Sequence, residues 1–194
     1  MRSTVVNVIG LALAVSVVAA LILAAVTKKV FHVEIEISAP PEAVWAVLTD
    51  TERYAEWNPT QVEVRGTHAV GSQLVAVFDA PEIKPFEVQL TVIEMDSPRL
   101  LRQGGGVRGI ITFDHRWMIS PTEHGSLVVQ HEIDRGIYLL FWDSSWIEPA
   151  YRRASEALRA RVVGLTAQEI RSSNPDYAGS RKNRASKVLH QIRM

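Results

Sequence analysis

Residues 35–50 read IEISAPPEAVWAVLTD. The first three letters end a run, residues 31–37, in which apolar and polar side chains alternate as in a half-buried strand. Pro40 and Pro41 then open a helix that we expect to reach about Leu48, because proline is tolerated in the first turn of a helix. A strand followed at once by a short helix therefore begins the folded domain.

The sequence after this helix predicts a sheet. A second short helix covers residues 51–57 and stops before Asn58-Pro59, since helices usually end before a proline. Strand-like runs follow, and most are separated by turn residues. The predicted strands are 61–65, 73–78, 86–95, 99–103, 110–119 and 127–133. The main predicted turns lie at Gly71-Ser72, Ser97-Pro98, Gly104-Gly105-Gly106 and from Pro121 to Gly125.

A long helix ends the predicted domain. Its apolar side chains recur at helical spacing, and its arginines lie mostly off that stripe. Pro149 falls in the first turn of the regular part, and Asn174-Pro175 ends the helix. The stripe consists of Tyr151, Ala154, Leu158, Val162 and Leu165.

These elements predict an α+β fold. An antiparallel sheet of about seven strands must cover its apolar face, and the long helix is the element available to cover it. A strongly curved sheet around one helix does not close tightly at both ends, so it tends to leave an apolar pocket suited to a ligand. A fully packed core is the alternative.

Several motifs resemble the START-like, polyketide cyclase/dehydrase-type domains of the SRPBCC superfamily. They are residues 35–50, Tyr54-Ala55-Glu56-Trp57-Asn58-Pro59, Gly71, Asp114-His115-Arg116-Trp117-Met118-Ile119, Gly125-Ser126, Gln130-His131-Glu132 and Gly136. The resemblance covers residues 31–163. It implies a helix-grip fold, a curved sheet wrapped round a long C-terminal helix, with a hydrophobic cavity. It says little about activity, because the superfamily includes lipid and sterol carriers, polyketide cyclases, chaperone cofactors and oxygenase domains.

The sequence departs from the family pattern at Asp134, where relatives tend to carry an aromatic residue. This departure puts a fully apolar cavity floor in doubt.

A separate hydrophobic segment precedes the domain. Asn7 and Ser16 are the only polar side chains in residues 5–26, and no charge lies between Arg2 and Lys28. A helix of this length is roughly 33 Å long, which matches the hydrocarbon core of a bilayer. The rival interpretation is a cleaved signal peptide, but the apolar run exceeds the usual ~7–15 residues of a signal core. The segment predicts a single transmembrane anchor.

We therefore divide the chain into an anchor at residues 1–29, a ligand-binding domain at 30–165 and a basic, flexible tail at 166–194. Positive charges next to a membrane tend to stay in the cytoplasm, and Lys28 and Lys29 outweigh Arg2, which places the domain on the cytoplasmic side. The tail places Ala185, Val188, Leu189 and Ile192 at helical spacing among basic residues. Such a segment either binds anionic membrane lipid as a helix or remains a solvated tail.

Small residues recur every fourth position in the anchor, a pattern that can pair two helices into a homodimer. They are Ala12, Ser16, Ala20 and Ala24.

His115 is the first candidate site residue. Strand alternation places it on one face with Ile111, Phe113, Trp117 and Ile119, and we assign that face to the cavity. A histidine among aromatics could bind a ligand carbonyl or phenol, or act as a general acid or base. The alternative is a buried histidine bonded to a neighbouring strand.

The partner of His115 depends on the register of the next strand. Apolar alternation turns Leu127, Val129, His131 and Ile133 inward, whereas the family resemblance turns Val128, Gln130 and Glu132 inward. A slip of one residue exchanges the two faces, so both cannot hold. We follow the resemblance, with a turn of four residues that sets Gln130 opposite His115 and Glu132 diagonal to it.

Aromatic side chains complete the predicted ligand site. Phe113 and Trp117 share the face of His115, and four further aromatics could line the cavity or its mouth. Those four are Trp57, Phe86, Trp142 and Trp146. Core packing alone would also explain most of them, because aromatic side chains bury large areas.

Other chemistries find no support in the sequence. There is no cysteine, and the six histidines lack the short spacings of a zinc site, so we predict no metal and no cofactor. No serine lies in a nucleophile elbow. The Gly104-Gly105-Gly106 run fits no phosphate-binding pattern and is predicted to be a flexible turn. The domain is acidic, which argues against nucleic acid.

Three functions remain open. The first is a membrane-tethered binding or carrier protein for a lipophilic molecule such as a lipid, quinone or polyketide. The second is a polyketide cyclase/dehydrase-like enzyme in which His115 and Glu132 act as acid and base. The third is an assembly factor that recruits a partner to the membrane.

Overall fold

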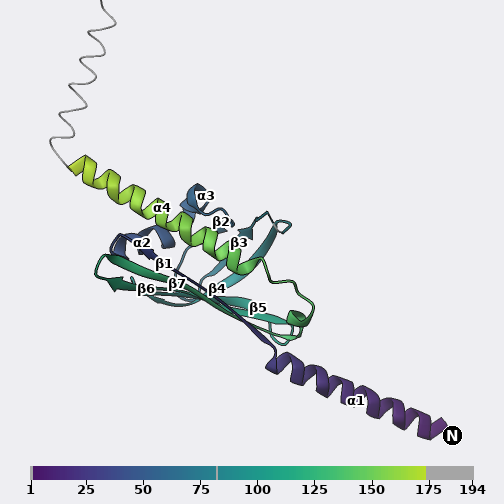
Figure 1. Cartoon of the computed structure of the whole chain (residues 1–194). Helices are drawn as coiled ribbons and strands as arrows, with labels where there is room; N and C mark the ends of the chain where they lie inside the picture. The colour runs from purple at the N-terminus through teal and green to yellow at the C-terminus, as the bar shows by residue number, and fades with distance from the viewer. Residues whose placement is uncertain (1, 82, 174–194) are drawn as a thin grey trace, which may run out of the picture.

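The computed structural model describes the backbone of residues 2–81 and 83–173, and the side chains of residues 7–23, 26–81 and 83–168. Figure 1 shows one sheet with a long helix lying across it and a second long helix projecting away from the domain. The strands are β1 Lys28–Ile37, β2 Gln61–Arg65, β3 Gln73–Phe78, β4 Phe86–Asp96, β5 Leu100–Val107, β6 Ile111–Thr122 and β7 Gly125–Arg135. The helices are α1 Arg2–Val26, α2 Pro41–Thr49, η1 Thr51–Arg53, α3 Tyr54–Trp57, η2 Ile137–Leu140 and α4 Ile147–Ser173.

The sheet is antiparallel throughout, in the order β1-β7-β6-β5-β4-β3-β2. Because β1 returns to pair with β7, the first and last strands of the chain lie side by side under α4 (Figure 1). The predicted seven-stranded antiparallel sheet with a C-terminal covering helix is therefore confirmed.

The core fills one half of the space under α4. Leu158 and Val162 are buried there against Val44 and Leu48 of α2 and Trp117 of the sheet. Burying each large aliphatic side chain contributes about 1.5–3 kcal/mol to folding. The N-terminal half of α4 covers a different region, where the side chains do not fill the space.

Helix α1 precedes the sheet and leaves its apolar side chains exposed. Ile9, Leu13 and Leu21, for example, are 55%, 62% and 65% exposed. Among the residues that the structure describes, no helix is long and apolar enough to cross a membrane. This finding does not support the anchor predicted from residues 5–26.

Two predicted turns are wrong. Gly104, Gly105 and Gly106 do not form a flexible turn but lie inside β5, where they pair with Asp114, Phe113 and Thr112 of β6. Glycine is needed because a Cβ on Gly105 would lie 2.9 Å from the Phe113 ring and 2.5 Å from a carbonyl oxygen of β4.

The turn between β6 and β7 is also shorter than predicted. Strand β6 continues through Pro121 to Thr122, which pairs with Gly125, so only Glu123 and His124 form the loop. A two-residue connection is the commonest type of hairpin loop. Helix α4 is described as far as Ser173, and its predicted end at Asn174-Pro175 lies outside the described residues. The tail segment from 174 onward, with its proposed membrane-binding helix, lies outside the described residues.

Two glycine substitutions test this backbone geometry. Gly125 has φ +148, and a Cβ there would lie 2.1 Å from the Ile37 carbonyl oxygen, whereas Gly164 of α4 has nothing within 4 Å. Gly125→Ala should lower the free energy of unfolding by about 2 kcal/mol or more. Gly164→Ala should raise it by about 0.5–1 kcal/mol, since alanine favours a helix. Urea denaturation of the full chain in non-ionic detergent measures both, and equal effects would contradict this description.

Candidate functional site

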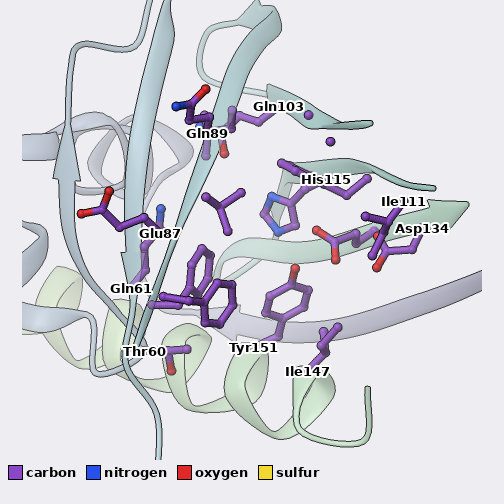
Figure 2. A pocket seen from close by; sticks show the side chains of 18 of the residues that line it. Thr60, Gln61, Glu87, Gln89, Gln103, Ile111, His115, Asp134, Ile147 and Tyr151 are labelled. Carbon is purple, nitrogen blue, oxygen red and sulfur yellow. The ribbon is translucent and has the colours of Figure 1, made fainter. Parts of the chain in front are cut away.

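A cavity of about 820 Å³ lies between the sheet and the N-terminal half of α4. Strands β4 to β7 supply its floor and walls, and Ile147, Tyr151 and Ala154 of α4 cover it. Figure 2 shows Tyr151 and Ile147 on the helix facing His115, Ile111 and Asp134 on the strands. This volume falls within the range of pockets that bind small organic molecules.

The period of two along the strands selects which side chains reach the cavity. On β6, Phe113, His115 and Trp117 point inward, as predicted. On β7, Gln130 and Glu132 point inward, so the face inferred from the family resemblance is the observed one and the face favoured by apolar alternation is wrong.

The predicted pairing needs one correction. Glu132 lies directly opposite His115, and Gln130 lies opposite Trp117. Strand β6 continues two residues further than expected, through Thr122, while β7 still begins at Gly125, and this shifts the pairing by two positions and keeps the same face inward.

His115 is buried and makes one hydrogen-bond contact with a neighbouring strand. Its Nε2 lies 3.3 Å from Gln130 Oε1, and its ring lies edge-on to Trp117 and Tyr151, with centroids 5.8 and 5.2 Å away. Burial lowers the pKa of His115 to about 4. The imidazole is therefore neutral at pH 7, and it can donate or accept a hydrogen bond without carrying charge.

Glu132 and Asp134 form a buried pair of carboxyl groups beside the Tyr151 hydroxyl. Burial, followed by the charge of Asp134, raises the pKa of Glu132 to about 8, although a hydrogen bond from Tyr151 opposes the shift. Burial also raises the pKa of Asp134. Two buried carboxylates this close repel each other, so ionising both is unfavourable. The pair therefore retains a proton near neutral pH.

Gln130 fixes the position of this cluster. Its Nε2 donates to the Tyr151 carbonyl oxygen at 3.0 Å and to Ser155 Oγ at 2.8 Å, and its side chain is almost fully buried. Gln130 thus joins the middle of β7 to the N-terminal third of α4 at the boundary between the core and the cavity.

The opposite wall is aromatic. The Phe86 ring stacks on Phe78 with centroids 5.4 Å apart and meets Trp146 edge-on at 6.0 Å. The ring centroids of Trp146 and Trp142 are 6.3 Å apart, and those of Trp142 and Tyr138 are 6.4 Å apart. Such edge-on and offset arrangements are favourable for aromatic rings, and all five rings face the cavity.

One predicted site residue lies elsewhere. Trp57, at the end of α3, does not line the cavity but packs in the core against Tyr54, with ring centroids 5.0 Å apart. The other eight predicted residues all face the cavity: Phe86, Phe113, His115, Trp117, Gln130, Glu132, Trp142 and Trp146.

Sequence reasoning missed the polar role of Tyr151, which it placed in the apolar stripe of the helix. Tyr151 does face the sheet, as its place in the apolar stripe predicts. Its hydroxyl group was the signal that the N-terminal end of the contact between α4 and the sheet is polar. Asp134 was noted only as a departure from the family. Within the described residues, no group of three histidine, aspartate or glutamate side chains could hold a metal ion.

Comparisons with known proteins agree with this architecture. Residues 28–163 match the family model for polyketide cyclase / dehydrase and lipid transport. The fold is similar to norcoclaurine synthase from Thalictrum flavum in complex with dopamine and hydroxybenzaldehyde, with a TM-score of 0.57 and 18% identity over 71% of this chain and 88% of that one.

Two bacterial structures are equally similar. A protein from Nitrosomonas europaea has a TM-score of 0.58 and 15% identity, covering 71% of this chain and 96% of its own. A protein from Mesorhizobium loti has a TM-score of 0.55 and 17% identity, covering 71% and 98%. No curated protein matches the chain. At these identities the likeness is one of fold.

The raised pKa of Glu132 makes stability depend on pH in a defined direction. Between its ordinary value of 4.5 and about 8, the folded state retains a proton that the unfolded state releases, so stability falls as pH rises through this window. Glu132→Gln cannot ionise. It should therefore exceed the wild type in free energy of unfolding by on the order of 2 kcal/mol at pH 8.5, and by much less at pH 4.5.

Urea denaturation of the full chain in non-ionic detergent at both pH values measures the difference. Glu87→Gln is the matched control, because Glu87 is exposed and pairs with Arg65 at 2.5 Å. A Glu132→Gln effect that is the same at both pH values would contradict a buried, protonated Glu132.

Proposed function

The chain belongs to the polyketide cyclase / dehydrase and lipid-transport family, and on that premise we propose that it binds a lipophilic small molecule in the cavity under α4. The observation that carries this proposal is the cavity itself, a space of about 820 Å³ whose lining is mostly apolar and aromatic with a few polar side chains. Concave pockets of this size and character are the usual sites of small-molecule ligands.

The arrangement of the walls indicates an amphiphilic ligand. The row of aromatic rings from Phe78 to Tyr138 suits an apolar body, whereas Glu132, Tyr151 and His115 offer hydrogen bonds to polar groups of the ligand. A few polar groups in a mainly apolar pocket fix the orientation of a ligand and select among ligands. Binding or transport of such a molecule is the function that this geometry supports best.

A second function is favoured by the same polar cluster. Glu132, with a pKa near 8, can give or take a proton close to neutral pH, and Tyr151 is hydrogen-bonded to it. A general acid or base works best when its pKa lies near the working pH. Acid–base catalysis on a bound polyketide-like molecule therefore remains the alternative, with Glu132 better suited to the proton transfer than His115, whose pKa is lowered.

We further propose that α1 holds the domain at a membrane, with the domain on the cytoplasmic side. The support is the sequence: residues 5–26 carry no charge, and the apolar side chains described on α1 are exposed. A lipophilic ligand dissolves in the bilayer, so a cavity held nearby would gain direct access to it.

The first test identifies the ligand. The full chain, purified in mild detergent from its own host, should carry a co-purifying small molecule that mass spectrometry detects. Val88→Trp should reduce the bound amount at least tenfold, because Val88 faces the cavity beside Phe86 and Leu90 and the indole would occupy the space. Val163→Trp is the matched control on the exposed side of α4 and should retain the ligand. Equal loading of both variants and the wild type would refute binding in this cavity.

The second test concerns the membrane. The full chain expressed in its host should remain in the membrane pellet after alkaline carbonate extraction, whereas a chain that starts at Thr27 should appear in the supernatant. Thr27 is a suitable start because β1 begins at Lys28. Release of the full chain by carbonate would refute the tether without affecting the binding proposal.

A further inference from the structure

We propose that the cavity selects lipophilic molecules that carry a cationic amine, with Glu132 as the group that contacts the amine. This inference rests on the proposed binding function and specifies its ligand class. It follows from the charges of the cavity wall, from a buried carboxylate oxygen that lacks a partner, and from the position of the aromatic rings.

The charged groups on the wall are all acidic. Among the described residues that line the cavity, Glu87, Glu132 and Asp134 are the charged ones, and none is lysine or arginine. Glu87 is exposed at the rim and is neutralised by Arg65. His115 is neutral near pH 7. The interior is therefore negative whenever the Glu132 and Asp134 pair holds fewer than two protons, and it would repel a carboxylate or phosphate ligand.

The nearest cation outside the wall does not neutralise this pair by contact. Lys29 of β1, opposite Asp134 in the sheet, directs its Nζ to the Trp142 carbonyl oxygen at 2.9 Å and to Ser144 Oγ at 2.8 Å. Asp114 on the outer face of β6 has its own partners, Arg102 and Arg116. Lys29 lowers the pKa of Asp134 by charge attraction, but neither Lys29 nor these two arginines is hydrogen-bonded to the inner carboxyls.

Asp134 retains an unused acceptor. The residue is 2% exposed, and its Oδ1 has no hydrogen-bond partner among the described residues. A buried acceptor without a partner costs about 1–3 kcal/mol, so such an atom usually marks a site that another group satisfies. Glu132 also lines the cavity, opposite His115 in the sheet, and at 7% it is the more exposed carboxyl of the pair, so we assign the contact with the amine to Glu132.

The surroundings also suit a cation. Tyr151 points from α4 toward the strands that carry His115 and Asp134, as Figure 2 shows, and Phe113, Trp142 and Trp146 line the same cavity. Aromatic faces attract ammonium groups, most strongly where water is excluded. A bound cation would also allow both carboxyls to ionise, because it supplies the positive charge that the wall lacks. Amine binding should therefore release a proton from the pair.

Two probes of equal shape test the inference on the full chain in non-ionic detergent. Benzyltrimethylammonium carries a permanent charge, and neopentylbenzene is its neutral carbon isostere. We expect the cation to bind at least tenfold more tightly, measured by titration of tryptophan fluorescence. Because the probe itself does not titrate, its affinity should rise about tenfold between pH 6.5 and 9 as the pair loses its proton.

Three variants complete the experiment. Glu132→Gln should weaken the cation at least tenfold, abolish its pH dependence and leave the neutral probe within twofold of the wild type. Glu36→Gln, at an exposed acidic residue of β1 that does not line the cavity, should change neither probe. In Val88→Trp the indole fills the cavity. The fluorescence change that remains in this variant is the background from probe dissolved in the detergent.

The outcomes separate the two proposals. Signals from the wild type that equal those of Val88→Trp for both probes would mean that the cavity binds neither, which overturns the binding function together with this inference. A neutral probe that binds as tightly as the cation, or a cation that Glu132→Gln does not weaken, would overturn the amine specificity and leave the binding function standing.

Discussion

The Gln130 side chain makes the connection on which the domain depends, because it joins the sheet to α4 at a single buried point. Its amide donates to the Tyr151 carbonyl and to Ser155 Oγ, while its oxygen faces His115. An amide buried at this depth is costly unless its hydrogen bonds are made, so the helix cannot slide or tilt without losing several of them. Packing on one side of this contact is tight, with Leu158 and Val162 in the core. On the other side the sheet and helix stay apart, and that separation is the cavity.

The polar cluster beyond Gln130 is unfavourable for folding taken by itself. Burial raises the pKa of both Glu132 and Asp134, which means that the folded protein holds their charged forms at a cost. Apolar residues on the same strand face would pack without that penalty. Buried ionisable side chains that lower the stability of the fold are typical of functional sites. Binding and catalysis require such groups, whereas folding does not. Tyr151 and His115 complete a set of four polar groups on this part of the cavity wall.

Much of the fold could be predicted from the sequence because its signals are local. Alternation along β1 and β6, prolines at the start of α2, and the apolar stripe of α4 each report on one element at a time. The errors arise where distant segments meet. The Gly104-Gly105-Gly106 run resembles a turn until Phe113 is placed across from it, and the Glu123-His124 loop looks longer until β6 and β7 are aligned. Trp57 and Tyr151 both depart from their expected roles for the same reason: whether an aromatic side chain meets the core or the cavity depends on which neighbouring elements pack around it.

The size of the cavity follows from that glycine run. A side chain at Gly105 would collide with the Phe113 ring, and one at Gly106 would lie 2.2 Å from the Ile111 carbonyl oxygen, so β5 and β6 could not approach as they do. Both glycines line the cavity floor together with Phe113 and Ile111. This part of β5 has no side chains that project into the cavity. The Phe113 ring therefore packs against the backbone of Gly105 and leaves the space above it open. The volume under α4 is thus set on one side by Gln130, which holds the helix, and on the other by glycines that keep the floor empty. A sequence stretch that suggests a flexible loop instead forms part of a strand, and the space above it is bordered by the carboxyl pair and the aromatic row.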